Sequence, residues 1–141
     1  MFWDKNGNTV SGRKVELVIA DTTCNPDQAL TQARRAWDLA GGKGRIHANI
    51  LWEMGGAERV ITEVLEQAKG LIHGITCGAG MPYRLSEIAA RFNVHYYPIV
   101  SSARAFNALW RRAYHKASSL LGGVVYEDPW LAGGHNGLSN S

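Results

Sequence analysis

The sequence predicts an α/β fold in which parallel strands alternate with helices. Short apolar stretches rich in β-branched residues recur at 14–21, 45–52, 71–77, 95–100 and 122–128. Segments with apolar residues at helical spacing lie between them. Strands that precede helices at such short spacing form βαβ units around a parallel sheet. We therefore expect five strands and four helices in one domain. This periodicity is equally compatible with a doubly wound sheet and with a barrel.

The composition is that of an ordinary globular protein. Hydrophobic residues make up 45% of the 141 residues and charged residues 19%, and the formal net charge is only +3. This mild excess of positive charge does not predict nucleic-acid binding. No apolar run is long enough to cross a bilayer, and residues 1–14 lack the pattern of a signal peptide. Cys24 and Cys77 show no metal or redox spacing, so we expect a reduced, cytoplasmic protein without a metal site.

The clearest helix signal lies between the first two predicted strands. Asn25 can accept hydrogen bonds from free backbone N–H groups, Pro26 suits the first helical position, and Gln28 completes a capping-box spacing. Leu30 and later apolar residues recur at helical spacing. The pair at 41–42, two glycines, is expected to end this helix.

The other helices are predicted from apolar spacing and from their ends. A second helix carries Val60 to Ala68, and a short third helix carries Leu85 to Phe92. A longer fourth helix, capped by Ser101 or Ser102, carries its apolar face from residue 106 to 114. Pro98 is awkward inside strand 95–100, so we expect a local bulge or an unpaired N–H there.

Several candidate binding or catalytic residues lie at or just after the ends of the predicted strands. In a parallel sheet the carboxyl ends of the strands share one edge, where ligands bind. Glycines allow a flat ring or a phosphate close to the backbone, and a serine at a helix start offers donors to anions. A histidine between glycines suits proton abstraction near neutral pH. The candidates at this edge are Asn49, Gly78, Gly80, Ser101, Gly133, Gly134 and His135.

Each candidate also has a structural interpretation. Glycine turns after strands are often only tight turns, Asn49 could pair with backbone, and Ser101 and Ser102 could simply cap a helix. His135 could be an ordinary surface histidine. The three histidines at 47, 73 and 95 lack acidic or thiol partners at ligand spacing, so we do not expect a metal site. The basic stretch 110–116 is best explained as the outer face of a helix.

Four segments in order resemble the nitronate monooxygenases, also called 2-nitropropane dioxygenases, which are themselves similar to flavin-dependent enoyl-acyl-carrier-protein reductases. The segments are ARRAWDLAGGKGRIHANIL, ITCGAGMPYRLSEIA, YYPIVSSARAF and VVYEDPWLAGGHNG. The resemblance runs from about Ala33 to about Gly137, and residues 1–24 do not match the family. The AGGH-x-G motif together with the upstream GAG-x-P turn is the most specific part.

The resemblance implies a TIM-type (β/α) barrel that binds FMN at its carboxyl face. Asn49 would face the flavin, the turn with Gly78 and Gly80 would line the pocket, and Ser101 would lie beside it. Gly133 and Gly134 would border the flavin. His135 would match the catalytic base in the oxidation of alkyl nitronates or nitroalkanes by O2.

The chain departs from the family in extent. A complete barrel of this type takes about 250 residues, so this chain has room for roughly five of the eight units. His47 also stands where the family usually has glycine. Residues 1–141 are therefore expected to form a single, incomplete barrel domain. Two alternatives are an inactive partial barrel that self-associates through open sheet edges, and an enoyl reductase that uses FMN and NADH.

Overall fold

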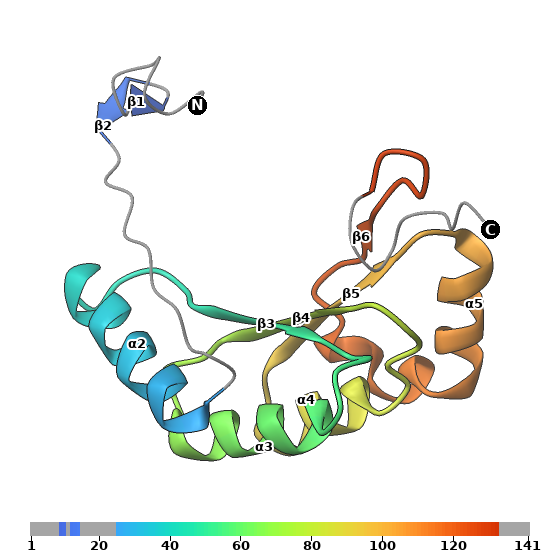
Figure 1. Ribbon diagram of the computed structural model, residues 1–141, viewed down its shortest axis with the longest axis horizontal. Coiled ribbons are helices and arrows are strands. Elements are labelled where there is room, and N and C mark those ends of the chain that lie inside the picture. Colours follow the sequence, from blue (N-terminus) through green and yellow to red (C-terminus); the bar gives the residue numbers. More distant parts are fainter. Residues whose placement is uncertain (1–8, 11, 15–24, 133–141) are drawn as a thin grey trace.

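The computed structural model describes residues 9–10, 12–14 and 25–132, and its centre is a parallel sheet (Figure 1). The sheet has four strands in the order β3-β4-β5-β6, and every neighbouring pair is parallel. Its strands are β3 (His47–Leu51), β4 (Gly74–Gly78), β5 (His95–Val100) and β6 (Val125–Tyr126). The predicted α/β class with a parallel sheet is confirmed.

Helices connect these strands and lie along one face of the sheet (Figure 1). They are α2 (Pro26–Leu39), α3 (Ala57–Gln67), α4 (Leu85–Phe92), α5 (Ala103–Arg112) and the 3-10 helix η1 (Tyr114–Leu120). Helices α3, α4 and α5 each follow one strand and precede the next, as in βαβ units. In the part of the chain that the structure describes, the opposite face of the sheet carries no helix.

The local signals at the ends of α2 act as predicted. The Asn25 side chain accepts hydrogen bonds from the backbone N–H groups of Asp27 and Gln28, at 2.9 and 3.3 Å. Pro26 occupies the first turn, where its missing N–H costs nothing. Gly41 follows the helix with φ of 66°, a left-handed conformation that favours glycine.

The predicted fourth helix is shorter than expected. Helix α5 ends at Arg112, and Ala113 has a non-helical φ of −143°. The chain then continues as η1, which places Tyr114 in the core with no exposed surface. Apolar spacing through Tyr114 suggested a continuous helix, whereas the contacts of the Tyr114 side chain require the chain to turn after Arg112.

The last strand is also shorter than the predicted span of 122–128, and Pro98 explains part of this. In β5, Tyr96 forms a bridge with Leu121 and Ile99 pairs with Val125. Between these two pairs β5 advances by three residues, whereas the neighbouring segment advances by four. The extra residue lies opposite Pro98, which cannot donate a hydrogen bond to that neighbour. The predicted irregularity at Pro98 is therefore present as a local bulge in the pairing.

Most of the predicted first strand, residues 15–21, lies outside the described residues. Arg13 and Lys14 form β2 (Arg13–Lys14), which pairs antiparallel with β1 (Thr9–Val10). Sequence analysis did not anticipate this hairpin. Its turn contains Gly12 with φ of 73°, a conformation that glycine adopts without steric cost.

The core lies between the sheet and the helices. Ile75, Cys77 and Tyr96 point from the sheet toward the helices and have no exposed surface. The Tyr96 and Tyr114 rings meet edge to face, with centroids 5.0 Å apart. By contrast, the alternate residues His47, Asn49 and Leu51 of β3 are exposed, and Ile50 is the one residue of this strand that is buried. The sheet therefore has one packed face and one open face.

Burial of Cys77 predicts a pH dependence of stability. Desolvation raises the pKa of its thiol from 9.0 to about 12. Above pH 9 the unfolded chain loses this proton while the folded chain keeps it, so stability should fall between pH 9 and 12, with a slope of up to about 1.4 kcal/mol per pH unit. Urea denaturation of the wild type and of Cys77→Ala across this range isolates the effect. Parallel pH profiles for the two proteins would contradict it.

Candidate functional site

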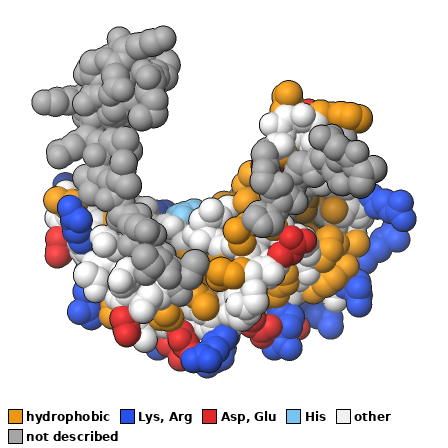
Figure 2. Space-filling view, viewed as in Figure 1, with side chains coloured by type: hydrophobic (Ala, Val, Ile, Leu, Met, Phe, Trp, Pro, Cys, Tyr) orange, Lys and Arg blue, Asp and Glu red, His pale blue; other side chains and the backbone are white. Residues whose placement is uncertain are grey.

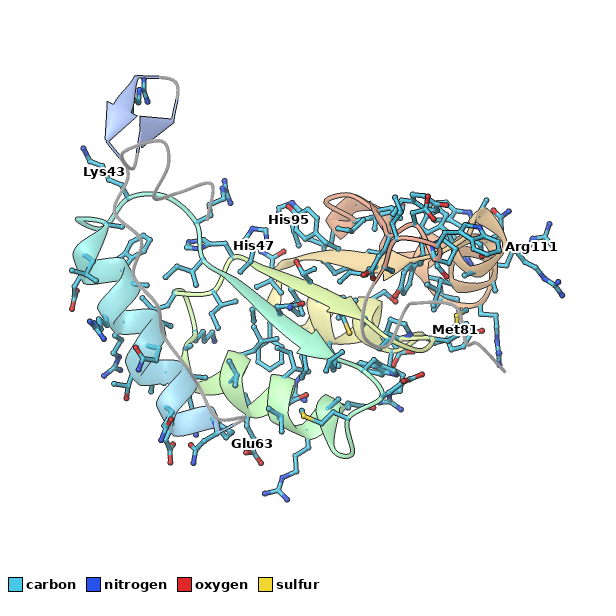
Figure 3. The ribbon with its side chains drawn as sticks, turned by 45° about the horizontal axis from the view of Figure 1, so that its top comes forward. Lys43, His47, Glu63, Met81, His95 and Arg111 are labelled. Atoms are coloured by element: carbon cyan, nitrogen blue, oxygen red, sulfur yellow. The ribbon has the colours of Figure 1, made fainter. Side chains whose placement is uncertain are left out.

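The candidate site is the rim formed by the carboxyl ends of the parallel strands. Leu51 pairs with Gly78, and Cys77 pairs with Pro98, so β3, β4 and β5 end at nearly the same level. Figure 3 shows Met81 at this end, just beyond β4, and His47 and His95 at the opposite end. The loops that follow the strands are therefore gathered at one edge, as the fold class predicts.

Asn49 lies below this rim, in the middle of β3. It pairs with Thr76 of β4 and is exposed on the same side as His47 and Leu51. The intervening Ile50 points into the core and is 8% exposed. Within the described ranges, the Asn49 amide has no hydrogen-bond partner, so it is free to bind a ligand on the open face.

The turn after β4 is held tightly by its neighbours. A Cβ atom at Gly78 would stand 2.8 Å from the Cβ of Ile99, and one at Gly80 would stand 3.0 Å from the Cγ of Glu53. Between them, Ala79 is buried with a φ of 60°, a strained conformation for alanine. Packing thus explains both glycines, and their cofactor role stays a prediction.

Tyr114 fixes the loop that continues from this turn. Its hydroxyl donates a hydrogen bond of 2.8 Å to the carbonyl of Pro82, and both residues are buried. Burial raises the pKa of Tyr114, and negative charge on Cys77 and Tyr96 adds to the effect. The tyrosine therefore stays neutral and keeps its donor. Sequence analysis treated Tyr114 only as an apolar helix residue and missed this contact.

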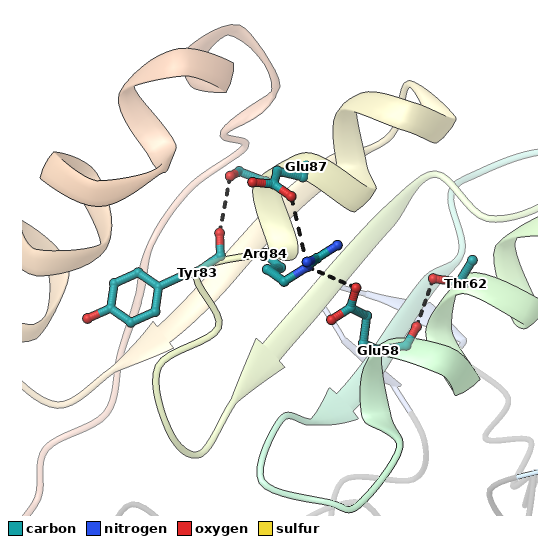
Figure 4. Close-up of polar contacts among 6 residues, drawn as sticks. Glu58, Thr62, Tyr83, Arg84 and Glu87 are labelled. Carbon is teal, nitrogen blue, oxygen red and sulfur yellow. Dashed lines mark hydrogen bonds and ion pairs between the residues drawn. The ribbon is translucent and has the colours of Figure 1, made fainter.

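Charged residues support the same loop from outside (Figure 4). The Arg84 Nε atom lies 2.9 Å from Glu58 Oε1, at the start of α3, and 3.9 Å from Glu87 in α4. All three side chains are well exposed, so each ion pair contributes little to stability. Their effect is to orient the start of α4 relative to α3.

The two serines after β5 have different roles. Ser102 is the N-cap of α5, and its Oγ accepts a hydrogen bond of 3.1 Å from the Ala105 N–H. Ser101 is half-buried at the rim. Its hydroxyl makes no hydrogen bond to any residue that the structure describes. Because Ser102 already caps the helix, Ser101 is available for another role.

The remaining predicted residues, Gly133, Gly134 and His135, lie outside the described residues. The chain that leads to them leaves β6 at the same rim, because β6 is parallel to β5. It turns at Asp128, whose side chain accepts a hydrogen bond of 2.9 Å from the Trp130 N–H. Ala132 is the last residue of this turn that the structure describes.

Two of the three histidines considered for a metal site, His47 and His73, make side-chain contacts with their neighbours. The His47 and Tyr97 rings lie 5.0 Å apart on the open face, and Gly74 leaves room for His47. His73 Nδ1 accepts a hydrogen bond of 3.1 Å from the Ile46 N–H. No group of three His, Cys, Asp or Glu residues suited to a metal ion occurs among the described residues.

Comparison with known proteins does not assign the chain to a family, since no family model and no curated protein matches it. Among the described helices, none combines the length and the apolar character needed to traverse a bilayer.

Removal of the Tyr114 hydroxyl should weaken the rim loop. In Tyr114→Phe the buried Pro82 carbonyl loses its donor, which should lower the free energy of unfolding by about 1–3 kcal/mol. Tyr83→Phe is the matched control, because the Tyr83 ring keeps its contact with Arg112 and its hydroxyl makes no hydrogen bond to a described residue. Urea denaturation measures both changes. Equal stability of the two variants would show that the contact does not anchor the loop.

Because Ile99 lies so close to Gly78, a larger residue at position 78 should lower the stability of the protein. Gly78→Ala should destabilise the protein by about 1–3 kcal/mol, because both strands must shift to accept a methyl group. Gly55→Ala should change stability by less than about 0.5 kcal/mol, since a Cβ there would meet nothing within 4 Å. Thermal unfolding of both variants tests this. A tolerated alanine at 78 would point to a looser turn.

Proposed function

We propose that the sheet is part of a TIM-type (β/α) barrel and that its carboxyl rim is the active site of an FMN-dependent oxidoreductase similar to nitronate monooxygenases. One observation carries this proposal: Asn49, the turn 78–80 and Ser101 come from three neighbouring parallel strands, with the turn and Ser101 at the rim and Asn49 on the open face below it. Helices on one face only, with an open opposite face, are also the arrangement of a barrel wall.

The described residues suit one wall of a flavin site. Asn49 offers an amide and Ser101 a hydroxyl, and neither is used by another described residue. Both could hydrogen-bond the polar edge of the flavin ring. Gly78 and Gly80 would contribute through their backbone, because Ile99 and Glu53 fill the space beside them. When bound, FMN supplies the electron acceptor for nitronate oxidation.

His135 is the proposed base. An imidazole has a pKa near neutrality, so it can accept the acidic α-proton of a nitroalkane or orient the anionic nitronate. The overall reaction converts an alkyl nitronate and O2 into a carbonyl compound and nitrite. In the sequence, glycines at 133 and 134 precede His135 and an asparagine follows it.

Flavin binding and turnover provide separate tests of this function. The protein should keep the yellow FMN absorbance after desalting, and Asn49→Ala should weaken FMN binding measured by fluorescence titration. His135→Ala should still bind FMN but lose nitronate turnover, measured as nitrite release. His115→Ala is the matched control, since His115 is exposed on η1. Absence of bound flavin in the wild type would refute the cofactor, and normal turnover in His135→Ala would refute the base.

A further inference from the structure

Among the residues that the structure describes, no strand pairs with the β3 edge of the sheet. The Ile46 carbonyl accepts a hydrogen bond from the His73 N–H, and the Trp52 N–H donates one to the Gly78 carbonyl. Ile46 and Trp52, which flank β3, therefore direct their backbone polar groups toward β4. In a strand the alternate residues turn the other way. His47, Asn49 and Leu51 therefore direct N–H and C=O groups to the free edge, and no described residue pairs with them.

An apolar groove lies beside this edge, between β3, α2 and α3. Its volume is about 460 Å³, and its lining includes Ala33, Ile50 and Met54. Gln32 also lines it, and the Gln32 Oε1 atom is buried without a hydrogen-bond partner in the described part of the chain. A buried acceptor without a donor costs free energy, so the groove suits an apolar group that carries an N–H or O–H.

The opposite edge, at β6, exposes side chains of that kind. Tyr126 is 63% exposed and Trp130 is 82% exposed, and both carry a donor on an aromatic ring. Hydrophobic side chains gather around this end of the molecule (Figure 2). We call the set the β6 patch; its members are Val124, Val125, Tyr126, Trp130 and Leu131.

We propose that two copies of the chain join edge to edge and close an eight-stranded parallel barrel. Each copy contributes the four described strands, with the β3 edge of one copy beside the β6 edge of the other, and the reverse at the second seam. A two-fold axis generates both seams at once. The β6 patch of each copy then covers the groove beside β3 of the partner copy.

A second copy fits these surfaces better than the other occupants. It supplies a parallel edge with the same twist and with helices on the same outer face. It also covers three open features together, namely the β3 edge, the β6 patch and the open face with Tyr97 and Ile99. A segment of the same chain laid along β3 would cover only the first of these. Parallel sheets are normally covered on both faces, which favours closure.

Closure would also complete the rim. The loops of one copy form only part of a ring of eight, and the partner copy would bring the same loops to the opposite side. The proposed function and this assembly depend on different observations, because the seams involve the sheet edges and not the cofactor. Association is therefore measured without FMN, so that failure of either proposal leaves the other testable.

Sedimentation of the full chain tests the assembly. We expect a dimer, and we expect the double variant Val125→Lys and Tyr126→Lys to raise the dissociation constant by about tenfold or more, because charges on an edge strand oppose pairing. Leu39→Lys is the matched control: Leu39 is 62% exposed on α2 and belongs neither to the β6 patch nor to the lining of the groove, so its replacement should leave association unchanged. Circular dichroism confirms that each variant is folded.

Disulfide trapping identifies the seam. With Cys24→Ser, the double variant Leu51→Cys and Val125→Cys should form a disulfide-linked dimer under mild oxidation, because neighbouring strands bring Cα atoms within disulfide range. Lys69→Cys, in the exposed turn after α3, with Arg104→Cys on α5 should not form one. A monomer at the highest soluble concentration, open-ended larger oligomers, or equal trapping of both pairs would overturn the proposal.

Discussion

A parallel sheet needs both of its faces covered, and this requirement governs the whole molecule. Helices α2 to α5 lie on one face, where Ile75, Cys77 and Tyr96 are fully buried. The other face carries the exposed side chains of His47, Asn49 and His95 and the partly exposed Tyr97. Burial on the helical face supplies most of the stabilisation, because apolar area removed from water is the main favourable term in folding. The open face is where chemistry and association become possible.

Packing on the helical face of the sheet also fixes the position of the loop at the rim. Tyr114, brought into the core by the break after α5, holds the Pro82 carbonyl and so fixes the loop beyond β4. The Ile99 side chain fills the space where Gly78 has no Cβ, so the end of β4 lies close against β5. Strain at Ala79 persists because these neighbours determine the backbone there. A site on this rim is thus supported by rigid elements.

Local signals were sufficient to predict most of the elements. The cap at Asn25, the stop at Gly41 and the apolar periods located the helices and the strands from 45 onward. Long-range contacts could not be predicted in this way. The break after Arg112 depends on what the Tyr114 ring touches, and the short β6 depends on the bulge opposite Pro98. For the site, the sequence placed Gly78 and Ser101 at the rim, but Asn49 lies lower, in the middle of β3, and the neighbours that pack against the glycines could not be predicted.

If a second copy completes the sheet, the β3 edge is paired only in the dimer. Backbone amide hydrogen exchange at His47, Asn49 and Leu51, followed at several protein concentrations, tests it most directly. Protection of these three amides should rise with protein concentration, while protection in β4 should stay constant. Fast exchange at every concentration, or protection that does not depend on concentration, would contradict it.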